Sequence, residues 1–390
     1  MALTERYVTT TGTDTYANST NIATPMSLST AITNGTAGDR INIKAGTYTR
    51  SATDTIAGAG TVTSPLIWRG YNSTPGDLDT PVQSTGNLSL TTTNFPLIDY
   101  SGNSANRFNW TGGFSLWQNL YIKTAYDGNS ILMNGGNQAA YNCKFEDNGT
   151  GTSAVALYME VRCTCVACDI SLTGASGGAN AVTMNGGTTG NRIIGSYING
   201  GPATGILLQS GGSQVLVCNS VIAGHTKHGI SISSAGGSAF GAIILYNTIC
   251  KKTGSGTFDA INVATGLTYH HVFVGNHITD HGGTAYGINM VSTSNAAFLA
   301  FNRTRDNTSG AIGNGGDWIT ATTLGHVTTD TGGPETDYTD NATNNFSLIS
   351  AAPAKGAGLP AYLDIGAMQR QETAGGGGLL VHPGMGGGMI

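Results

Sequence analysis

Charged residues are scarce in this sequence: Lys, Arg, Asp and Glu make up 10% of its 390 residues. Ordinary globular domains contain about 25% of them, largely because long charged side chains coat exposed helix faces. The chain also contains 59 Gly residues, which interrupt helices. The composition therefore argues against an all-helical protein. Because the net charge is only −5, no broad basic surface is expected, and nucleic acid is not predicted as a partner.

Long hydrophobic runs are missing as well. The longest apolar runs have the length of strands and are interrupted by Gly, Thr or Asn, so we expect no insertion into a membrane. Residues 1–8 lack the basic and apolar regions of a secretory signal peptide. No secretory signal is therefore recognised.

The chain has six cysteines, and three of them are closely spaced at Cys163, Cys165 and Cys168. A zinc site normally needs a fourth ligand and paired two-residue spacings, and neither is present. No metal or cofactor is predicted. Cys218 and Cys250 take repeat positions otherwise held by Tyr, Ile or Phe, which indicates small buried hydrophobes. A disulfide between neighbouring coils is the alternative.

The sequence does contain a pattern that returns every 23 to 29 residues. Each unit has a short apolar run, a turn residue and a further residue three places on, as in Trp117, Asn119 and Ile122. The turn residues in our alignment are Asn119, Asn142, Asp169, Gly195, Asn219, Asn247, Asn276 and Asn302. Units of this kind cannot bury a face alone and must stack on their neighbours. The chain is therefore predicted to be a solenoid.

A second apolar segment follows the turn residue by about ten positions, as at residues 205–208, 229–232 and 287–290. Short strands separated by Gly, Asn and Ser turns leave no room for a ten-residue helix. Each unit should be one coil of parallel β-structure, with equivalent residues about 4.8 Å apart. The recurrent Asn residues could then lie over one another at a tight corner.

Both flanks add detail. A Pro-led segment at residues 25–32 predicts a short helix over the first coil, with Leu28, Ala31 and Ile32 on one face. The following Gly38-Asp-x-Ile-x-Ile-x-x-Gly-x-Tyr48 stretch resembles the first coil of pectate-lyase-like right-handed parallel β-helix proteins. The segment from Phe346 to Gly358, followed by Asp364-Ile-Gly-Ala367-Met-Gln369, resembles their closing segment. Ala352 and Met368 depart from it, where Ser and an aromatic residue are usual.

This resemblance implies an all-β fold, a single-stranded right-handed parallel β-helix with an N-terminal cap and a C-terminal Gly-rich tail. The expected divisions are the cap and first coil at residues 1–50, the coils at 51–345, a closing segment at 346–372 and the tail at 373–390. Fold alone does not supply function.

Enzymes of this superfamily act on polysaccharides, so catalytic residues were sought directly. The three Asp and Gly-His-Gly of polygalacturonase-like hydrolases have no counterpart here, nor does the acidic calcium cluster of the pectate lyases. The remaining weak candidates are Asp280, His281 and Asp306 on one edge of the stack. Lys251 and Lys252 share this edge, and His225 and His228 lie one coil away. The patch suits acid–base chemistry, or equally a solvated ladder of charges.

Aromatic residues are candidate sugar contacts, because sugar rings lay their apolar faces on exposed aromatic rings. Trp110 and Trp318 are the predicted glycan contacts, whereas Trp68 and Trp117 are expected to be structural. Further candidates are Tyr71, Tyr121 and Tyr126.

The C-terminal segment couples a flexible Gly linker at residues 375–378 to a compact apolar peptide. Its predicted docking residues are Leu379, Leu380, Val381, Pro383, Met385, Met389 and Ile390. We expect an assembly tail that docks on a neighbouring subunit, with a frayed terminus as the alternative.

Together these features resemble bacteriophage virion proteins. The predicted function is a structural virion component, a tailspike, fibre or head or tail decoration, with glycan binding as an added role. The predicted partners are copies of the chain in a homo-oligomer, with a trimer favoured, other virion proteins and a polysaccharide. The predicted location is the virion or the extracellular space. The alternatives are a polysaccharide lyase or glycoside hydrolase acting on surface glycans, and a self-assembling extracellular filament subunit.

Overall fold

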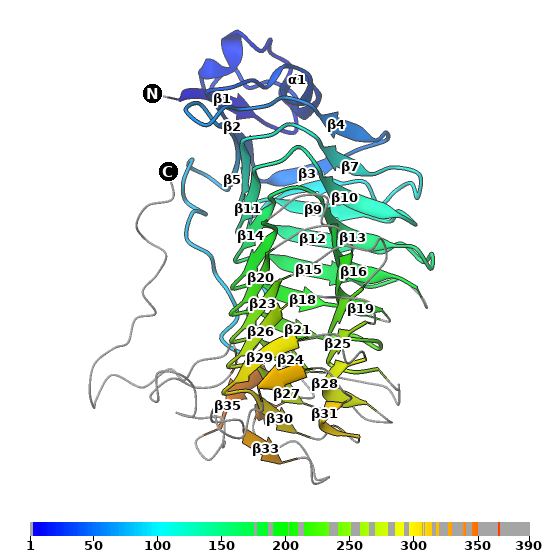
Figure 1. The fold of residues 1–390 in the computed structure, drawn as a ribbon. Coiled ribbons are helices and arrows are strands. Elements are labelled where there is room, and N and C mark those ends of the chain that lie inside the picture. Colours follow the sequence, from blue (N-terminus) through cyan, green and yellow to red (C-terminus); the bar gives the residue numbers. More distant parts are fainter. Residues whose placement is uncertain are drawn as a thin grey trace, which may run out of the picture.

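In the computed structural model the chain forms a parallel β-helix, which confirms the predicted fold class (Figure 1). The structure describes residues 3–174, 178–185, 190–201, 203–209, 214–233, 241–250, 258–264, 270–279, 285–291, 296–305, 307, 309–313, 317–319, 327–329, 338–340, 345–349 and 366. Three parallel sheets, here called A, B and C, contain 12, 11 and 10 strands respectively. Each coil contributes one strand to each sheet.

The strands have these bounds. Sheet A contains β1 (Thr4–Val8), β2 (Asp39–Lys44), β5 (Leu66–Tyr71), β8 (Ser115–Gln118), β11 (Gln138–Tyr141), β14 (Thr164–Val166), β17 (Arg192–Ile194), β20 (Val215–Cys218), β23 (Ala242–Leu245), β26 (His270–Val274), β29 (Ala296–Ala300) and β32 (Asp317–Ile319). Sheet B contains β3 (Gly46–Thr49), β6 (Pro96–Asp99), β9 (Tyr121–Thr124), β12 (Lys144–Asp147), β15 (Asp169–Leu172), β18 (Tyr197–Asn199), β21 (Val221–Ala223), β24 (Thr248–Cys250), β27 (His277–Thr279), β30 (Arg303–Arg305) and β33 (Val327–Thr329). Sheet C contains β4 (Asp54–Ile56), β7 (Phe108–Trp110), β10 (Asn129–Met133), β13 (Val155–Met159), β16 (Asn180–Asn185), β19 (Thr204–Gln209), β22 (Ile230–Ile232), β25 (Ile261–Val263), β28 (Tyr286–Met290) and β31 (Gly310–Gly313).

The first coil is covered by the 3-10 helix η1 (Asn18–Thr20) and the helix α1 (Leu28–Asn34). Ser27 caps α1, because its side chain accepts a hydrogen bond from the Thr30 amide. Leu28 and Ala31 are buried against the first coil, as the sequence predicts. No helix among the described residues is long and apolar enough to span a membrane.

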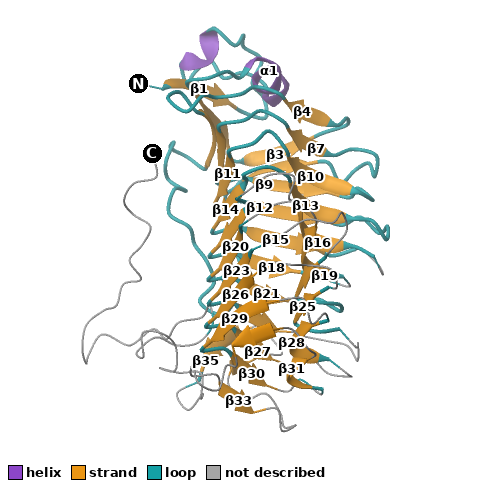
Figure 2. Cartoon of the chain, in the orientation of Figure 1, coloured by secondary structure: helices purple, strands orange, loops and turns teal. Residues whose placement is uncertain are grey.

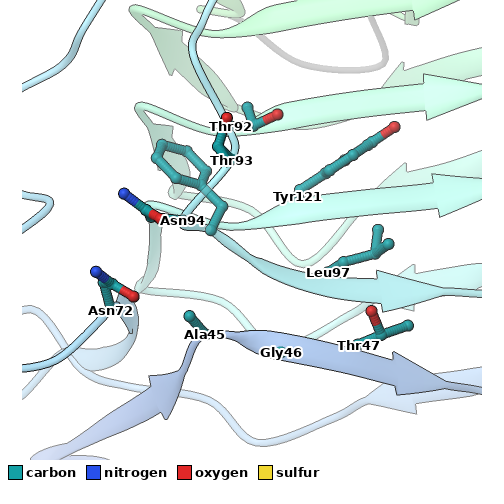
Figure 3. A pocket seen from close by; sticks show the side chains of 10 residues that line it. Ala45, Gly46, Thr47, Asn72, Thr92, Thr93, Asn94, Leu97 and Tyr121 are labelled. Atoms are coloured by element: carbon teal, nitrogen blue, oxygen red, sulfur yellow. The ribbon is translucent and has the colours of Figure 1, made fainter.

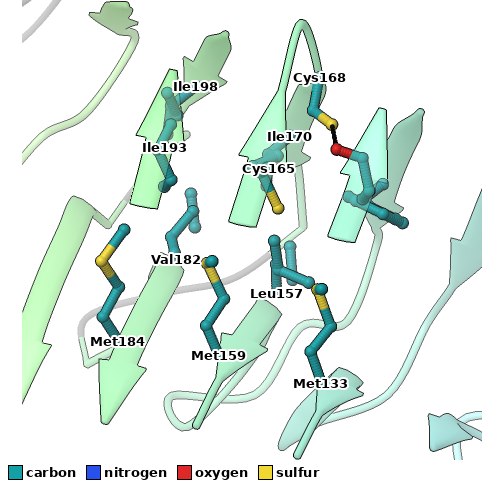
Figure 4. Packing of buried hydrophobic residues seen from close by; sticks show 14 of the residues in the cluster. Met133, Leu157, Met159, Cys165, Cys168, Ile170, Val182, Met184, Ile193 and Ile198 are labelled. Carbon is teal, nitrogen blue, oxygen red and sulfur yellow. Dashed lines mark hydrogen bonds between the residues drawn. The ribbon is translucent and has the colours of Figure 1, made fainter. Parts of the chain in front are cut away.

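Inward side chains from the three sheets form one continuous core. Trp68 and Trp117, on adjacent strands of sheet A, are stacked with ring centroids 5.0 Å apart. Lower in the stack, Met133, Met159 and Met184 line up along sheet C in successive coils (Figure 4). Each such side chain contributes about 1.5–3 kcal/mol when fully buried. The core is therefore a set of columns along the stack.

Eight successive coils, from β8 to β30, each have one left-handed residue at the corner between sheets A and B. These residues, with φ between 50° and 67°, are Asn119, Asn142, Ala167, Gly195, Asn219, Tyr246, Gly275 and Phe301. The next residue in each coil points into the corner, and this inner column includes Cys143, Cys168, Ser196, Ser220, Asn247, Asn276 and Asn302. The repeated Asn therefore occupies two adjacent positions.

This register corrects part of our sequence alignment. Asp169 is two residues beyond the left-handed Ala167, and it lies on the outer face of sheet B. Asn247, Asn276 and Asn302 each follow the left-handed residue of their own coil, which is Tyr246, Gly275 or Phe301. The stacking itself is as predicted, since Asn142 donates to Asn119 at 2.7 Å and Asn247 donates to Asn276 at 3.0 Å.

A long excursion leaves the stack between β5 and β6. This segment, residues 72–95, is called the arm, and it runs along the corner between sheets A and B as the long cyan loop of Figure 1. Figure 2 shows it as loop along most of its length. Asn119 donates to Asp79 at 2.9 Å, Asn142 donates to the Leu78 carbonyl at 3.0 Å, and Gln83 donates to the Gly195 carbonyl at 2.9 Å. The arm thus clasps several coils together.

The last described strands, β34 (Tyr338–Asp340) and β35 (Asn345–Leu348), form an antiparallel pair. Tyr338 and Phe346 pack on the outer face of sheet B with Tyr197, Val221, Ala223 and Cys250. The lower outer face of sheet B is therefore covered.

Candidate functional site

The upper outer face of sheet B carries a group of ionisable side chains. Strand alternation turns Ile122 and Phe145 inward, so their neighbours on β9 and β12 face outward. The outward residues are Tyr121 and Lys123 on β9 and Lys144 and Glu146 on β12, and parallel register places them side by side. We call these four residues the sheet B cluster.

Glu146 is the centre of the sheet B cluster. The Tyr121 hydroxyl donates to Glu146 Oε2 at 2.6 Å, and the Lys123 and Lys144 ammonium groups each lie 3.3 Å from a Glu146 oxygen. The Lys144 Nζ atom is also 4.9 Å from the centre of the Tyr121 ring. The ring of Tyr121 is therefore held in one orientation.

These contacts fix the charge states of the sheet B cluster. Burial acts to raise the pKa of Glu146, but the Tyr121 hydroxyl and the two Lys ammonium groups outweigh it, so the pKa lies below its usual range. Burial, followed by the hydrogen bond to Glu146, raises the pKa of Tyr121. At neutral pH the carboxylate is ionised and the phenol keeps its proton.

An open cavity of about 380 Å³ adjoins the sheet B cluster (Figure 3). Its lining residues are Ala45, Gly46, Thr47, Asn72, Thr92, Thr93, Asn94, Phe95, Leu97 and Tyr121. They come from the start of β3, both ends of the arm, β6 and β9, which lie far apart in the sequence. None of these side chains is charged, and most combine hydroxyl or amide groups with apolar surface. Such a lining suits a small polar ligand with an apolar face.

The returning half of the arm is fixed close to the cavity. The Leu90 amide donates to the Asp169 carboxylate at 3.1 Å, and Asp169 is 5% exposed. Burial raises the pKa of Asp169, while the nearby Lys144 opposes this shift. The arm therefore positions Thr92 to Phe95 against sheet B through a buried contact.

The structure tests only one of the two predicted glycan contacts, Trp110. Trp110 is 1% exposed; its indole donates to Ser115 at 2.7 Å, and it packs edge-on against Trp117. A buried ring offers no face to a sugar, so the prediction for Trp110 is corrected. Trp318 lies on β32, but its side chain is outside the description, and its role stays a prediction.

The predicted edge patch and tail lie mostly outside the described residues. Asp280, His281 and Asp306 follow strands β27 and β30 but are not described themselves, nor is the tail from Leu379 to Ile390. Of the flanking histidines, His225 is buried, and His228 contacts the Asp259 carbonyl at 3.1 Å.

Among the described residues, no three His, Cys, Asp or Glu side chains gather in a group that could hold a metal ion. All six cysteines are free thiols, and five of them are buried. Burial raises the pKa of Cys163 to about 12, so this thiol remains protonated. The close spacing of Cys163, Cys165 and Cys168 therefore reflects inward positions in one coil.

The sequence indicated Tyr121 as a candidate sugar contact but did not predict the sheet B cluster or the cavity beside it. Alternation in residues 121–124 and 144–147 places Tyr121, Lys123, Lys144 and Glu146 on one face once the register is known. No comparable signal in the sequence shows where the arm returns.

Comparisons with known proteins agree with this architecture. No protein-family model matches the chain, and no curated protein sequence matches it. Among solved structures, it is similar to pectate lyase Pel9A, with a TM-score of 0.66 over 95% of this chain and 97% of that one, at 13% identity. It is also similar to an alginate lyase from Paenibacillus sp. str. FPU-7, with a TM-score of 0.51 over 75% and 96% of the two chains, at 18% identity.

The chain shares its fold with polysaccharide lyases. Identities this low show the fold alone, and a fold does not transfer an activity.

Proposed function

We propose that this protein is a rigid structural β-helix that binds a neutral sugar unit of a polysaccharide in the cavity beside Tyr121. The observation that carries the proposal is the uncharged lining of that cavity, in which a held aromatic ring adjoins hydroxyl and amide groups of Thr47, Asn72 and Asn94. A sugar presents C–H groups to a ring and hydroxyls to amides, so its chemistry matches this lining.

The proposed setting is a bacteriophage virion, as a tailspike, fibre or decoration protein. An elongated stack of three sheets, clasped along one corner by the arm, suits a rod exposed on a particle. Mass spectrometry of purified particles made from the encoding genome tests this setting. Peptides of this chain at structural copy number are expected, and their absence from the particles would count against it.

Binding is tested with the purified full chain on an array of neutral and uronic-acid oligosaccharides, followed by calorimetry on the best neutral ligand. Removing the ring in Tyr121→Ala should weaken binding about two- to tenfold, because an aromatic contact contributes about 0.5–1.5 kcal/mol. Tyr158→Ala is the matched control, since Tyr158 is another half-buried outward tyrosine, on β13 of sheet C. Equal affinities for Tyr121→Ala and the parent chain would contradict the proposed site.

A polysaccharide lyase is the second candidate, and the sheet B cluster is the specific observation that favours it. Two Lys ammonium groups, a protonated phenol and an ionised carboxylate lie within hydrogen-bonding or ionic contact. Release of unsaturated uronate from pectate or alginate, lost in Lys123→Ala, would support this function. Binding of neutral sugars without any such product would support the proposed one.

A further inference from the structure

The outer face of sheet A becomes apolar in its lower coils. Register places Leu216, Ile243, Val272 and Phe298 in one outward column, and Cys218, Leu245, Val274 and Ala300 in the next. We call these eight residues the apolar face. One coil higher, Arg192 occupies the first column and is exposed. The first column is thus apolar from β20 to β29, whereas the second column continues upward through Ile194 of β17 and Val166 of β14.

Part of the apolar face is open to solvent. Phe298 is 40% exposed, and Leu216, Ile243 and Leu245 are half-buried. Covering such surface stabilises a protein by about 25 cal/mol per Å². An apolar segment that packed on these side chains would therefore stabilise the protein.

The size of the apolar face favours a peptide over a second rod. Its four strands span about 14 Å, and its two columns are about 7 Å apart, so the rectangle that they outline covers only about 100 Å². A stable interface between two proteins needs about 800 Å² on each partner. A short segment tethered to the same molecule needs far less, because a flexible linker supplies an effective concentration in the mM range.

The last described residue, Gly366, lies at the corner between sheets A and B that borders the apolar face. The Gly366 amide donates to the Gly275 carbonyl at 2.8 Å, and Gly275 directly follows β26. From Gly366 to Leu379 there are 13 residues, which span up to about 45 Å when extended. Residues 375–378 are all Gly, so this connection bends without cost from side chains. Every part of the apolar face is within reach.

We propose that the C-terminal peptide, residues 379–390, packs on the apolar face of its own chain. Its apolar run Leu379, Leu380 and Val381 matches the face in character. This inference replaces the neighbouring subunit of the sequence-based prediction with sheet A of the same molecule. It does not depend on sugar binding.

Cys218 provides a direct test, because it lies on the apolar face and is the one cysteine of the six that is not buried. In the full chain carrying Leu380→Cys, mild oxidation should link residues 218 and 380 within one molecule, as read by peptide mass spectrometry. The control carries Cys218→Ala, Ser231→Cys and Leu380→Cys, which moves the acceptor thiol to an outward position on sheet C. We expect at least a fivefold higher yield of the linked peptide in the first protein.

Mixing isotopically heavy and light protein before oxidation shows whether the tail bound to the apolar face belongs to the same chain or to a neighbouring copy. Linked peptides that are all-heavy or all-light support docking within one chain, whereas heavy–light pairs would place the tail on a neighbouring copy and overturn the inference. Equal yields in the test protein and the control would also overturn it. Added to the test protein, Ile243→Asp should cut the yield about fivefold, and Ser231→Asp should not. If Ile243→Asp does not fold, Leu379→Asp with Val381→Asp makes the same test from the tail.

Discussion

At the residue scale, buried amides hold the lower corner of the helix. Asn276 Oδ1 accepts from both the backbone and the side chain of Asn247, at 3.1 and 3.0 Å. Its own Nδ2 donates to the Ile244 carbonyl at 2.9 Å and to Asn302 at 2.9 Å. All three asparagines are 0% exposed. A buried amide in a ladder satisfies polar groups in two neighbouring coils at once.

Replacing Asn276 by Ala should therefore cost about 2–4 kcal/mol of unfolding free energy, because buried donors of Asn247 lose their acceptor. Urea unfolding followed by circular dichroism measures this loss. Asn262→Ala is the control, since Asn262 is an outward, half-buried residue of β25. A loss no larger in Asn276→Ala than in the control would show that the ladder contributes little.

Acidification changes the contributions of two carboxyl groups, Glu146 and Asp147, to the stability of the folded protein in opposite directions. The pKa of Glu146 is lowered in the folded chain, so its contribution is present above about pH 4.3 and is lost as the pH falls through the lowered value. Burial raises the pKa of Asp147, which hydrogen bonds from Thr124, Tyr126 and Gly149 only partly offset. Protonation of Asp147 therefore favours the folded state.

Unfolding midpoints measured from pH 7 to pH 3 test these signs. Glu146→Gln should lose less stability on acidification than the parent chain, because one acid-sensitive contribution is gone. Asp147→Asn should lose more, because a compensating gain is gone. Parallel curves for the parent chain and both variants would be inconsistent with these environments.

At the element scale, the arm joins coils that are not adjacent in the stack, because it contacts both Asn119 and Gly195. Asp79 accepts from Asn119 at 2.9 Å and from Gln118 at 3.0 Å, and Arg69 lies 3.4 Å away. Asp77, two residues earlier, accepts hydrogen bonds from the amides of Asn72, Ser73 and Thr74, all within the arm's own first turn. Asp79 thus binds the arm to the stack, whereas Asp77 stabilises the first turn of the arm itself.

Asp79→Ala should release the descending half of the arm, whereas Asp77→Ala should disturb only its first turn. Amide hydrogen exchange of residues 78–90 is the measurement. We expect at least a tenfold faster exchange in Asp79→Ala and little change there in Asp77→Ala. Unchanged protection in Asp79→Ala would mean that Leu90 and Gln83 suffice to hold the arm.

The sequence predicts the coils well and their exact alignment less well. Alternating apolar residues and the 23 to 29 residue spacing are sufficient to predict stacked strands. They do not separate the two corner positions, because Asn suits both: it tolerates the left-handed backbone at Asn219, and it forms the inner ladder at Asn247. Coils of unequal length leave that one-residue choice undetermined.

At the scale of the whole molecule, the three sheets differ in what covers them. The lower outer face of sheet B lies beneath Tyr338 and Phe346, and its upper part adjoins the cavity beside Tyr121. That cavity joins residues near positions 46, 72, 94 and 121, so local sequence pattern could not reveal it. By contrast, Trp110 looked free in sequence only because its packing against Trp117 depends on the stacked coils.

The most direct measurement of the central claim is a crystal structure of the full chain with a neutral oligosaccharide selected on the array. The account predicts a sugar ring in the cavity between Tyr121 and residues 92–95 of the arm, with its hydroxyl groups hydrogen-bonded to the threonine and asparagine side chains of the lining. A sugar bound on the outer face of sheet C, with the cavity beside Tyr121 empty, would contradict the account.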